Sequence, residues 1–185
     1  CCPPNVARLI ESFGQYAYGE DETTAFCHMI AAGKVTFANG LTLICNTDYP
    51  DDMTVHYSVS GTGEIAIHIP GWSRKYSLMQ DGVQVTYGKR EGYIFLTING
   101  SSEIELKLDD APGFIYASCK VPRIAGMVAL RRGPLVYCFE GNDNGSVKSL
   151  RIDTDSSPEV ASFSEELKAY TLSVKAVKEA DTEES

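Results

Sequence analysis

Apolar residues near the start of the chain recur with the period of an α-helix. Five of them share one helix face at the i, i+3, i+4, i+7 and i+11 spacing: Val6, Leu9, Ile10, Phe13 and Ala17. Proline is tolerated in a first helical turn and glycine favours a helix end, as Pro3, Pro4 and Gly19 would provide. The pattern predicts a helix directly after Cys1-Cys2. No second long helical pattern precedes residue 160, so we expect the partner of its apolar stripe to lie outside this chain.

From about residue 24 the period changes to the two-residue period of β-strands. Apolar and polar side chains alternate in three segments: residues 55–59, 65–69 and 104–108. Residues 93–98 are almost wholly apolar, as in a central strand covered on both sides. Glycine-containing turn sequences separate these segments: Ser60–Gly63, Asp81-Gly82 and Asn99-Gly100. Short strands punctuated in this way predict a mostly β protein, an antiparallel β-sandwich preceded by one helix.

The last third of the chain has a less regular pattern. Pro134 follows two arginines and a glycine between two apolar runs, and it predicts a bend or an edge because proline cannot donate to a sheet. Residues 147–153 and 167–177 predict further strands, whereas the polar segment 154–166 predicts a loop. The expected domains are a helix over 1–20, a sandwich over 21–122, a second partial sandwich or a continuation of the first over 123–178, and an acidic tail over 179–185.

Composition and charge narrow the classes of function. The 185 residues are 43% hydrophobic and 22% charged, which is typical of a globular protein. A net charge of −9 without a basic patch argues against nucleic-acid binding. No apolar run approaches the ~20 residues of a membrane helix, so no membrane partner is expected. The first residue is not Met and no signal peptide follows it, so the simplest interpretation places residue 1 inside a longer protein.

The six cysteines fall into two groups. Cys27, Cys45, Cys119 and Cys138 are scattered through apolar, strand-like stretches, and we expect them to be buried free thiols. Such thiols favour a reducing compartment, for example a bacterial cytoplasm. Cys1 and Cys2 instead stand ahead of a predicted helix, whose positive end favours a thiolate, which is both a nucleophile and a zinc ligand. Because two cysteines provide at most two of four ligands, the residues alone leave a functional site and an incidental pair both open.

Four segments, in order along the chain, match the motifs of one known family. The first is Cys1-Cys2-Pro3-Pro4-Asn5-Val6-Ala7-Arg8-Leu9. The others are Thr47-Asp48-Tyr49-Pro50, Ile67-His68-Ile69-Pro70-Gly71-Trp72 and the block from Gly126 to Glu140 that contains Arg-Gly-Pro-Leu-Val-Tyr-Cys. They resemble glycoside hydrolase family 127, the β-L-arabinofuranosidases and their relatives, whose signature for the first segment is Cys-Cys-Pro-(Pro/Ala)-Asn-x-x-Arg-(Leu/Phe). Four matches in the right order are far more specific than any one of them.

The resemblance implies an (α/α)6 barrel that holds an active site, followed by β-sandwich domains. Cys1 matches the family's nucleophile, a zinc-bound thiolate that attacks the anomeric carbon, and Cys2 matches a second zinc ligand. The implied reaction is retaining: a covalent intermediate forms, and water then displaces it with help from an acid/base carboxylate. In the family, that glutamate, the remaining zinc ligands and the sugar-binding histidines lie upstream of the cysteine pair. The helix of residues 1–20 is then the end of the barrel.

We therefore expect this chain to be the C-terminal portion of such an enzyme. Alone, it is expected to be inactive and to bind no zinc. The expected partners are the missing barrel and, in the whole enzyme, an arabinofuranoside-type carbohydrate.

Two other functions remain open from the residues. A carbohydrate-binding sandwich could use Trp72 and nearby tyrosines, provided that Trp72 is not buried against the core. The other is a small zinc protein. Cys27-His28 could be metal ligands, although neighbours in a strand point to opposite faces. Arg131, Arg132 and Glu140 are expected to form a surface or interdomain ion pair.

Overall fold

The computed structural model describes residues 2–178, and these form two compact units. The first unit runs to Asp109 and the second begins at Asp110. The predicted boundary lay at residue 122; it falls earlier because strand β10 (Pro112–Tyr116) pairs with β11 (Val128–Arg132) of the second unit. The predicted acidic tail, residues 179–185, lies outside the described residues. Among the described residues, no helix has the length and apolar character needed to span a bilayer.

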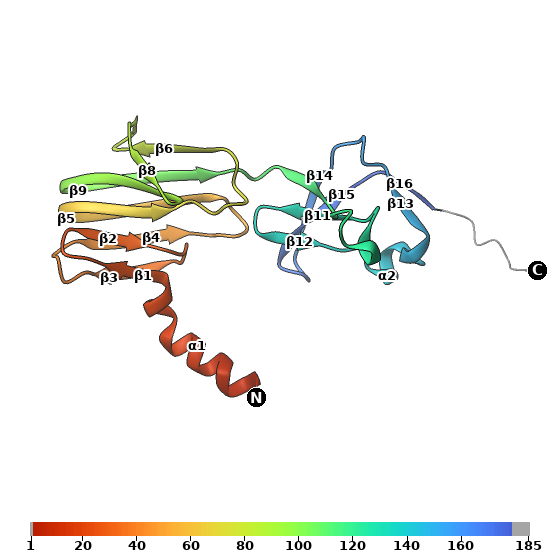
Figure 1. The fold of residues 1–185 in the computed structure, drawn as a ribbon, viewed down its shortest axis with the longest axis horizontal. Coiled ribbons are helices and arrows are strands. Elements are labelled where there is room, and N and C mark those ends of the chain that lie inside the picture. Colours follow the sequence, from red (N-terminus) through yellow and green to blue (C-terminus); the bar gives the residue numbers. More distant parts are fainter. Residues whose placement is uncertain (1, 179–185) are drawn as a thin grey trace, which may run out of the picture. The chain divides into compact units, whose positions relative to one another are not determined.

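The first unit contains one helix and nine strands (Figure 1). They are α1 (Cys2–Ala17), β1 (Tyr18–Glu20), β2 (Thr24–Cys27), β3 (Gly33–Thr36), β4 (Thr42–Thr47), β5 (Thr54–His68), β6 (Tyr76–Gln80), β7 (Val83–Gln84), β8 (Gly88–Arg90) and β9 (Tyr93–Leu108). The predicted helix is confirmed, with Pro3 and Pro4 in its first turn. It ends at Ala17, and Gly19 lies in β1 instead of forming the helix end. The predicted mostly β fold is confirmed as well.

Strands β5 and β9 are each longer than the sequence predicted. Residues 54–68 of β5 pair with residues 93–107 of β9, so 55–59 and 65–68 belong to one strand, and 93–98 and 104–108 belong to the other. Two of the predicted turn sequences therefore lie inside strands, where Gly61 of β5 stands opposite Gly100 of β9 with φ values of 121° and 96°. Glycine adopts this backbone region without the steric penalty of a Cβ atom, which lets the ladder continue through both positions. Asp81-Gly82 does form the predicted turn, between β6 and β7.

The long β5–β9 pair joins the two halves of a sandwich around one core. β4 pairs with the first part of β5 and β2 with its last part, while β8 and β6 pair with the two parts of β9. β2 runs parallel to β5, so the sheet is mixed rather than wholly antiparallel; the β3–β4 hairpin provides the crossover between them. Side chains from both halves share one buried cluster, including Cys27 of β2 and Cys45 of β4. This shared burial defines the core of the first unit.

Gly61 provides a test of the junction inside β5. A Cβ atom built there would lie 2.9 Å from the carbonyl oxygen of Gly40, and its φ of +121° is unfavourable for an L side chain. We expect Gly61→Ala to lower the free energy of unfolding by about 1–3 kcal/mol. Urea unfolding followed by circular dichroism measures this, with Gly71→Ala as control because a Cβ atom there meets nothing within 4 Å. Equal stabilities of the two variants would contradict the expected strain.

The second unit consists of small, separate sheets, drawn in green to blue in Figure 1. Its remaining elements are η1 (Pro122–Ile124), β12 (Leu135–Tyr137), α2 (Gly141–Asn144), η2 (Val147–Ser149), β13 (Leu150–Ile152), β14 (Glu159–Ser164), β15 (Ala169–Ser173) and β16 (Ala176–Lys178). β10, β11 and β12 form one sheet, β13 pairs with β16, and β14 pairs with β15. Pro134 lies at the predicted bend, between β11 and β12. β14 falls in the segment predicted to be a loop, because pairing with β15 orders a sequence whose own pattern is polar.

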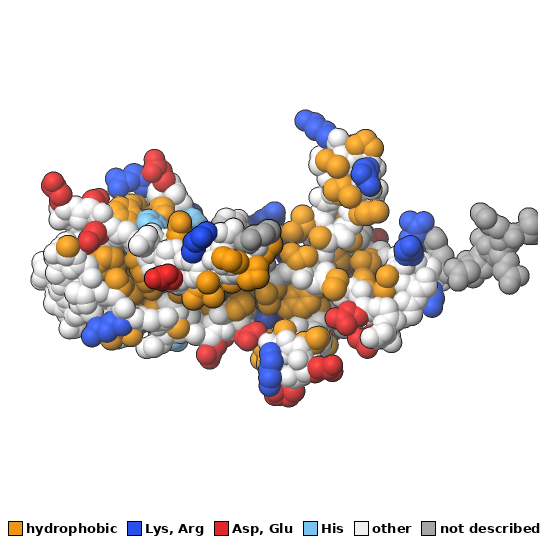
Figure 2. Space-filling model, turned by 90° about the horizontal axis from the view of Figure 1, so that it is seen from below, with side chains coloured by type: hydrophobic (Ala, Val, Ile, Leu, Met, Phe, Trp, Pro, Cys, Tyr) orange, Lys and Arg blue, Asp and Glu red, His pale blue; other side chains and the backbone are white. Residues whose placement is uncertain are grey.

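Few side chains are buried in the described part of the second unit. Leu130 is 8% exposed and Arg132 is 7% exposed, while hydrophobic side chains lie open on the surface (Figure 2). Arg132 Nη2 lies 3.8 Å from Asp110 Oδ2, and its guanidinium carbon lies 5.1 Å from the centre of the Tyr170 ring. Arg132 thus forms an ion pair, with Asp110, but its side chain is buried rather than on the surface. Its contact with the Tyr170 ring links β11 to β15.

Candidate functional site

Helix α1 carries the cysteine motif that the sequence singled out. Cys2 is the first residue of the helix and its side chain is exposed; Cys1 lies outside the described residues. Arg8 Nη1 donates a hydrogen bond to Asn5 Oδ1 over 3.0 Å, so two further residues of the motif interact on the helix surface. The described part of the motif is therefore a helix start with one exposed thiol and an adjoining polar pair.

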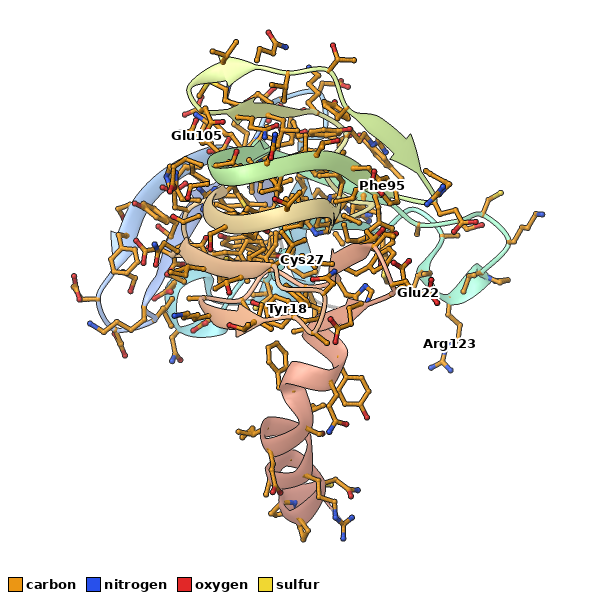
Figure 3. The ribbon with its side chains drawn as sticks, turned by 90° about the vertical axis from the view of Figure 1, so that its left-hand side faces the viewer. Tyr18, Glu22, Cys27, Phe95, Glu105 and Arg123 are labelled. Atoms are coloured by element: carbon orange, nitrogen blue, oxygen red, sulfur yellow. The ribbon has the colours of Figure 1, made fainter. Side chains whose placement is uncertain are left out.

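The apolar face of α1 is open in the described part of the chain. Ala17 is the only buried residue of the helix, and Ile10 is 72% exposed. Figure 3 shows the helix leading away from the strands, which it joins near Tyr18. Burying four or five such side chains would contribute several kcal/mol at roughly 25 cal/mol per Å². A face of this kind is suited to packing against other helices.

The described residues do not form a complete metal site. No group of three or more His, Cys, Asp or Glu side chains within residues 2–178 is placed to hold a metal ion. A structural zinc site needs four ligands and a catalytic one needs three protein ligands, so the described residues do not fit zinc on their own. Cys27 is buried, whereas the His28 ring contacts Tyr93 on the outer side of the sheet, so this pair does not converge on a common ligand position. The zinc-protein hypothesis gains no support.

The four scattered thiols differ in burial between the two units. Cys27 and Cys45 are buried free thiols, as predicted, and burial raises their pKa values to about 12 and about 11. Both thiols therefore stay protonated and unreactive near neutral pH. Cys119 and Cys138 are exposed, so the prediction of burial was wrong for these two. The physical reason is that their apolar neighbours belong to the second unit, which buries few side chains.

Neither Trp72 nor the aromatic group on β2 and β9 presents an open sugar-binding strip. Trp72 is partly buried and packs against the core of the first unit, which removes the main residue of the carbohydrate-binding hypothesis. A second aromatic group lies on the outer side of β2 and β9, but its ring faces are covered from within the unit. His28 stacks on Phe26 at 5.9 Å between ring centres, and the Arg90 guanidinium lies 4.6 Å from the centre of the Phe95 ring. A sugar needs a free ring face for stacking.

Comparison with known proteins decides the family. Residues 112–177 match the model of the glycoside hydrolase family 127 C-terminal domain. This part of the chain is a family 127 C-terminal domain. The match begins at the first residue of β10 and ends within β16, so it includes most of the described second unit. The resemblance read from the four sequence motifs is confirmed.

The similarity to known proteins extends well beyond that domain. "Non-reducing end beta-L-arabinofuranosidase" of Bifidobacterium longum subsp. longum is 38% identical over 156 residues, which are 78% of this chain and 24% of that protein. The crystal structure of a GH127 beta-L-arabinofuranosidase from Geobacillus stearothermophilus T6 is 32% identical, with a TM-score of 0.82 over 93% of this chain and 29% of its own. A GH127 beta-arabinofuranosidase structure at 23% identity, TM-score 0.84, shares the fold over 95% of this chain and 32% of its own. The chain thus spans about a quarter to a third of the length of these proteins.

Proposed function

We propose that this chain is the C-terminal part of a retaining glycoside hydrolase that releases β-L-arabinofuranosyl residues from non-reducing ends. The observation that carries the proposal is the 38% identity over 156 residues to a protein named for that activity. The crystal structure of a second arabinofuranosidase, at 32% identity and a TM-score of 0.82, supports it further.

We assign the nucleophile to Cys1. Its thiolate attacks the anomeric carbon of the sugar while the bond from that carbon to the leaving oxygen breaks. A carboxylic acid from outside this chain protonates that oxygen, which leaves as an alcohol. The resulting carboxylate then deprotonates a water molecule, which attacks the same carbon and restores the thiolate, so two displacements retain the configuration.

In this proposal, zinc is bound by the longer enzyme and not by this chain alone. Zinc is a borderline-soft ion that binds soft thiolates such as those of Cys1 and Cys2, and the rest of the ligand set comes from outside the chain. When bound, the metal would keep the thiolates deprotonated.

The chain alone is inactive in this proposal, because it lacks the second half of the catalytic pair. Retaining hydrolysis needs two groups about 5 Å apart on the two sides of the sugar, and this proposal places only the nucleophile here. The open apolar face of α1, with Ile10 72% exposed, is where we place the helices of the missing barrel. Those helices would bring the acid/base group to the cysteine pair.

Hydrolysis of 4-nitrophenyl β-L-arabinofuranoside tests the proposal. The longer protein that contains this chain is expected to release nitrophenol and to give the β anomer as the first product in a proton NMR time course. The isolated chain is expected to release none above the buffer rate. Turnover by the isolated chain would reject its assigned inactivity. First formation of the α anomer, or no hydrolysis by the longer protein, would reject the assigned reaction.

A further inference from the structure

Helix α1 passes into the sandwich without a linker residue. The helix ends at Ala17 and β1 begins at Tyr18. The carbonyl oxygen of Ala17 accepts two backbone hydrogen bonds, from His28 N at 2.8 Å and from Met29 N at 3.3 Å. Both donors follow β2, the strand that pairs with β1. The last turn of the helix is therefore tied directly to the sheet.

Side chains of β1 hold this junction from two further directions. The Tyr18 hydroxyl donates to the carbonyl oxygen of Ala31 over 3.2 Å, and its ring meets Phe37 edge-on at 6.3 Å. Burial raises the pKa of Tyr18 to about 12, so the hydroxyl stays a donor. Glu20 Oε2 accepts a hydrogen bond from the backbone N–H of Ala38 over 2.6 Å. These contacts connect β1 to Ala31, which precedes β3, and to Phe37 and Ala38, which follow it. They hold both ends of β1 in place.

The imidazole of His28 also restricts the backbone at the junction between α1 and β1. A Cβ atom built on Gly19 would lie 2.6 Å from His28 Nε2, about 1 Å short of an ordinary van der Waals contact. The ring cannot easily yield, since Nδ1 lies 2.7 Å from the Tyr93 hydroxyl and one face stacks on Phe26. Glycine is thus required at residue 19 by close approach. The sequence pattern predicted Gly19 only as a helix end, so it gave no indication of this role.

We infer that Tyr18, Gly19 and His28 are positioning residues for the cysteine pair, an inference that rests on the proposed function. Through the tied junction they set the direction of α1 relative to the sandwich. The helix is about 24 Å long at 1.5 Å per residue, so a tilt of about 10° at its end moves its start by about 4 Å. A nucleophile displaced by even 1 Å can lose about 10²-fold in rate. The sandwich is therefore part of the apparatus that places Cys1.

Hydrogen exchange of two amides in this chain tests the junction itself. The N–H groups of His28 and Met29, which donate to Ala17, are expected to be protected in the unaltered chain. Gly19→Ala is expected to speed their exchange about tenfold or more, and Gly19→Ala combined with His28→Ala is expected to restore most of the protection of Met29. Gly14→Ala is the matched control, since it lies in the same helix and its Cβ meets nothing within 4 Å. Unprotected amides in the unaltered chain would overturn the inference.

Kinetics of the longer enzyme test the positioning role. Gly19→Ala is expected to lower kcat about tenfold to hundredfold with KM changed less than about twofold, because substrate binding stays intact while the nucleophile shifts. The added His28→Ala substitution is expected to recover most of the lost kcat. A purely structural role would lower the amount of folded enzyme without this split between kcat and KM.

The outcomes separate this inference from the proposed function. If Gly19→Ala leaves kcat unchanged while Cys1→Ala abolishes turnover, the positioning role is wrong and the proposed function stands. If the longer enzyme hydrolyses no arabinofuranoside at all, the proposed function falls and the positioning role falls with it. The exchange result would then still describe a rigid junction.

Discussion

Cys1→Ala in the longer enzyme is expected to lower kcat for 4-nitrophenyl β-L-arabinofuranoside by about 10³-fold or more. Removal of a covalent nucleophile eliminates the two-step route, and losses of this order are usual when a nucleophile is deleted. KM is expected to change far less, because the thiolate acts mainly in the transition state. Initial rates of nitrophenol release over a range of substrate concentrations measure both quantities.

Two controls distinguish loss of the nucleophile from loss of structure. Cys119→Ala removes an exposed thiol of the second unit and is expected to leave kcat unchanged. Azide added to the Cys1→Ala enzyme is expected to attack the anomeric carbon directly and give an arabinosyl azide of inverted configuration. If Cys1→Ala retains more than about a tenth of the activity and still yields a retained product, another residue is the nucleophile.

The sequence predicted the existence of elements better than their limits. The spacing of apolar residues located α1 correctly, because a helix face repeats over several turns and Pro3 and Pro4 mark its start. Local turn chemistry was misleading inside β5 and β9, where Gly61 and Gly100 stand opposite each other in one continuous ladder. Glycine permits a sharp turn and an extended strand of positive φ alike. Only the pairing with another strand, distant in sequence, selects between the two.

Only the part of the candidate site that lies in a recognisable sequence motif could be predicted. Adjacent thiols ahead of a helix left a functional site and an incidental pair both open, and the resemblance of the surrounding motif to family 127 singled out Cys1 and Cys2, whose role stays a prediction. The junction formed by Tyr18, Gly19 and His28 left no comparable signal. The contacts of Ala17, Tyr18 and Gly19 with later segments join residues that are nine or more positions apart, such as Gly19 with His28, and no local period encodes them. Burial at Cys119 was also mispredicted, since an apolar neighbourhood in sequence does not ensure a packed unit.

Leu43→Ala is expected to lower the free energy of unfolding of the first unit by about 2–5 kcal/mol, whereas Ile44→Ala is expected to cost less than about 1 kcal/mol. The two residues are neighbours in β4 and lose similar aliphatic groups. Leu43 is fully buried opposite Val59, while Ile44 is 37% exposed opposite Ser58. Truncation at Leu43 leaves a cavity in the shared core, but water fills the space lost at Ile44.

Trp72 provides the measurement, because it is the only tryptophan of the chain and packs against this core. Urea unfolding followed by its fluorescence is expected to show a midpoint about 1–2 M lower for Leu43→Ala, with an unchanged slope. The Ile44→Ala midpoint is expected to stay within about 0.5 M of the unaltered chain. A slip of β4 by one residue would exchange the faces of the two side chains, since strand side chains alternate. The opposite order of the two midpoints would therefore show that the register of Leu43 against Val59 is wrong, and with it the placement of Cys45 in the core.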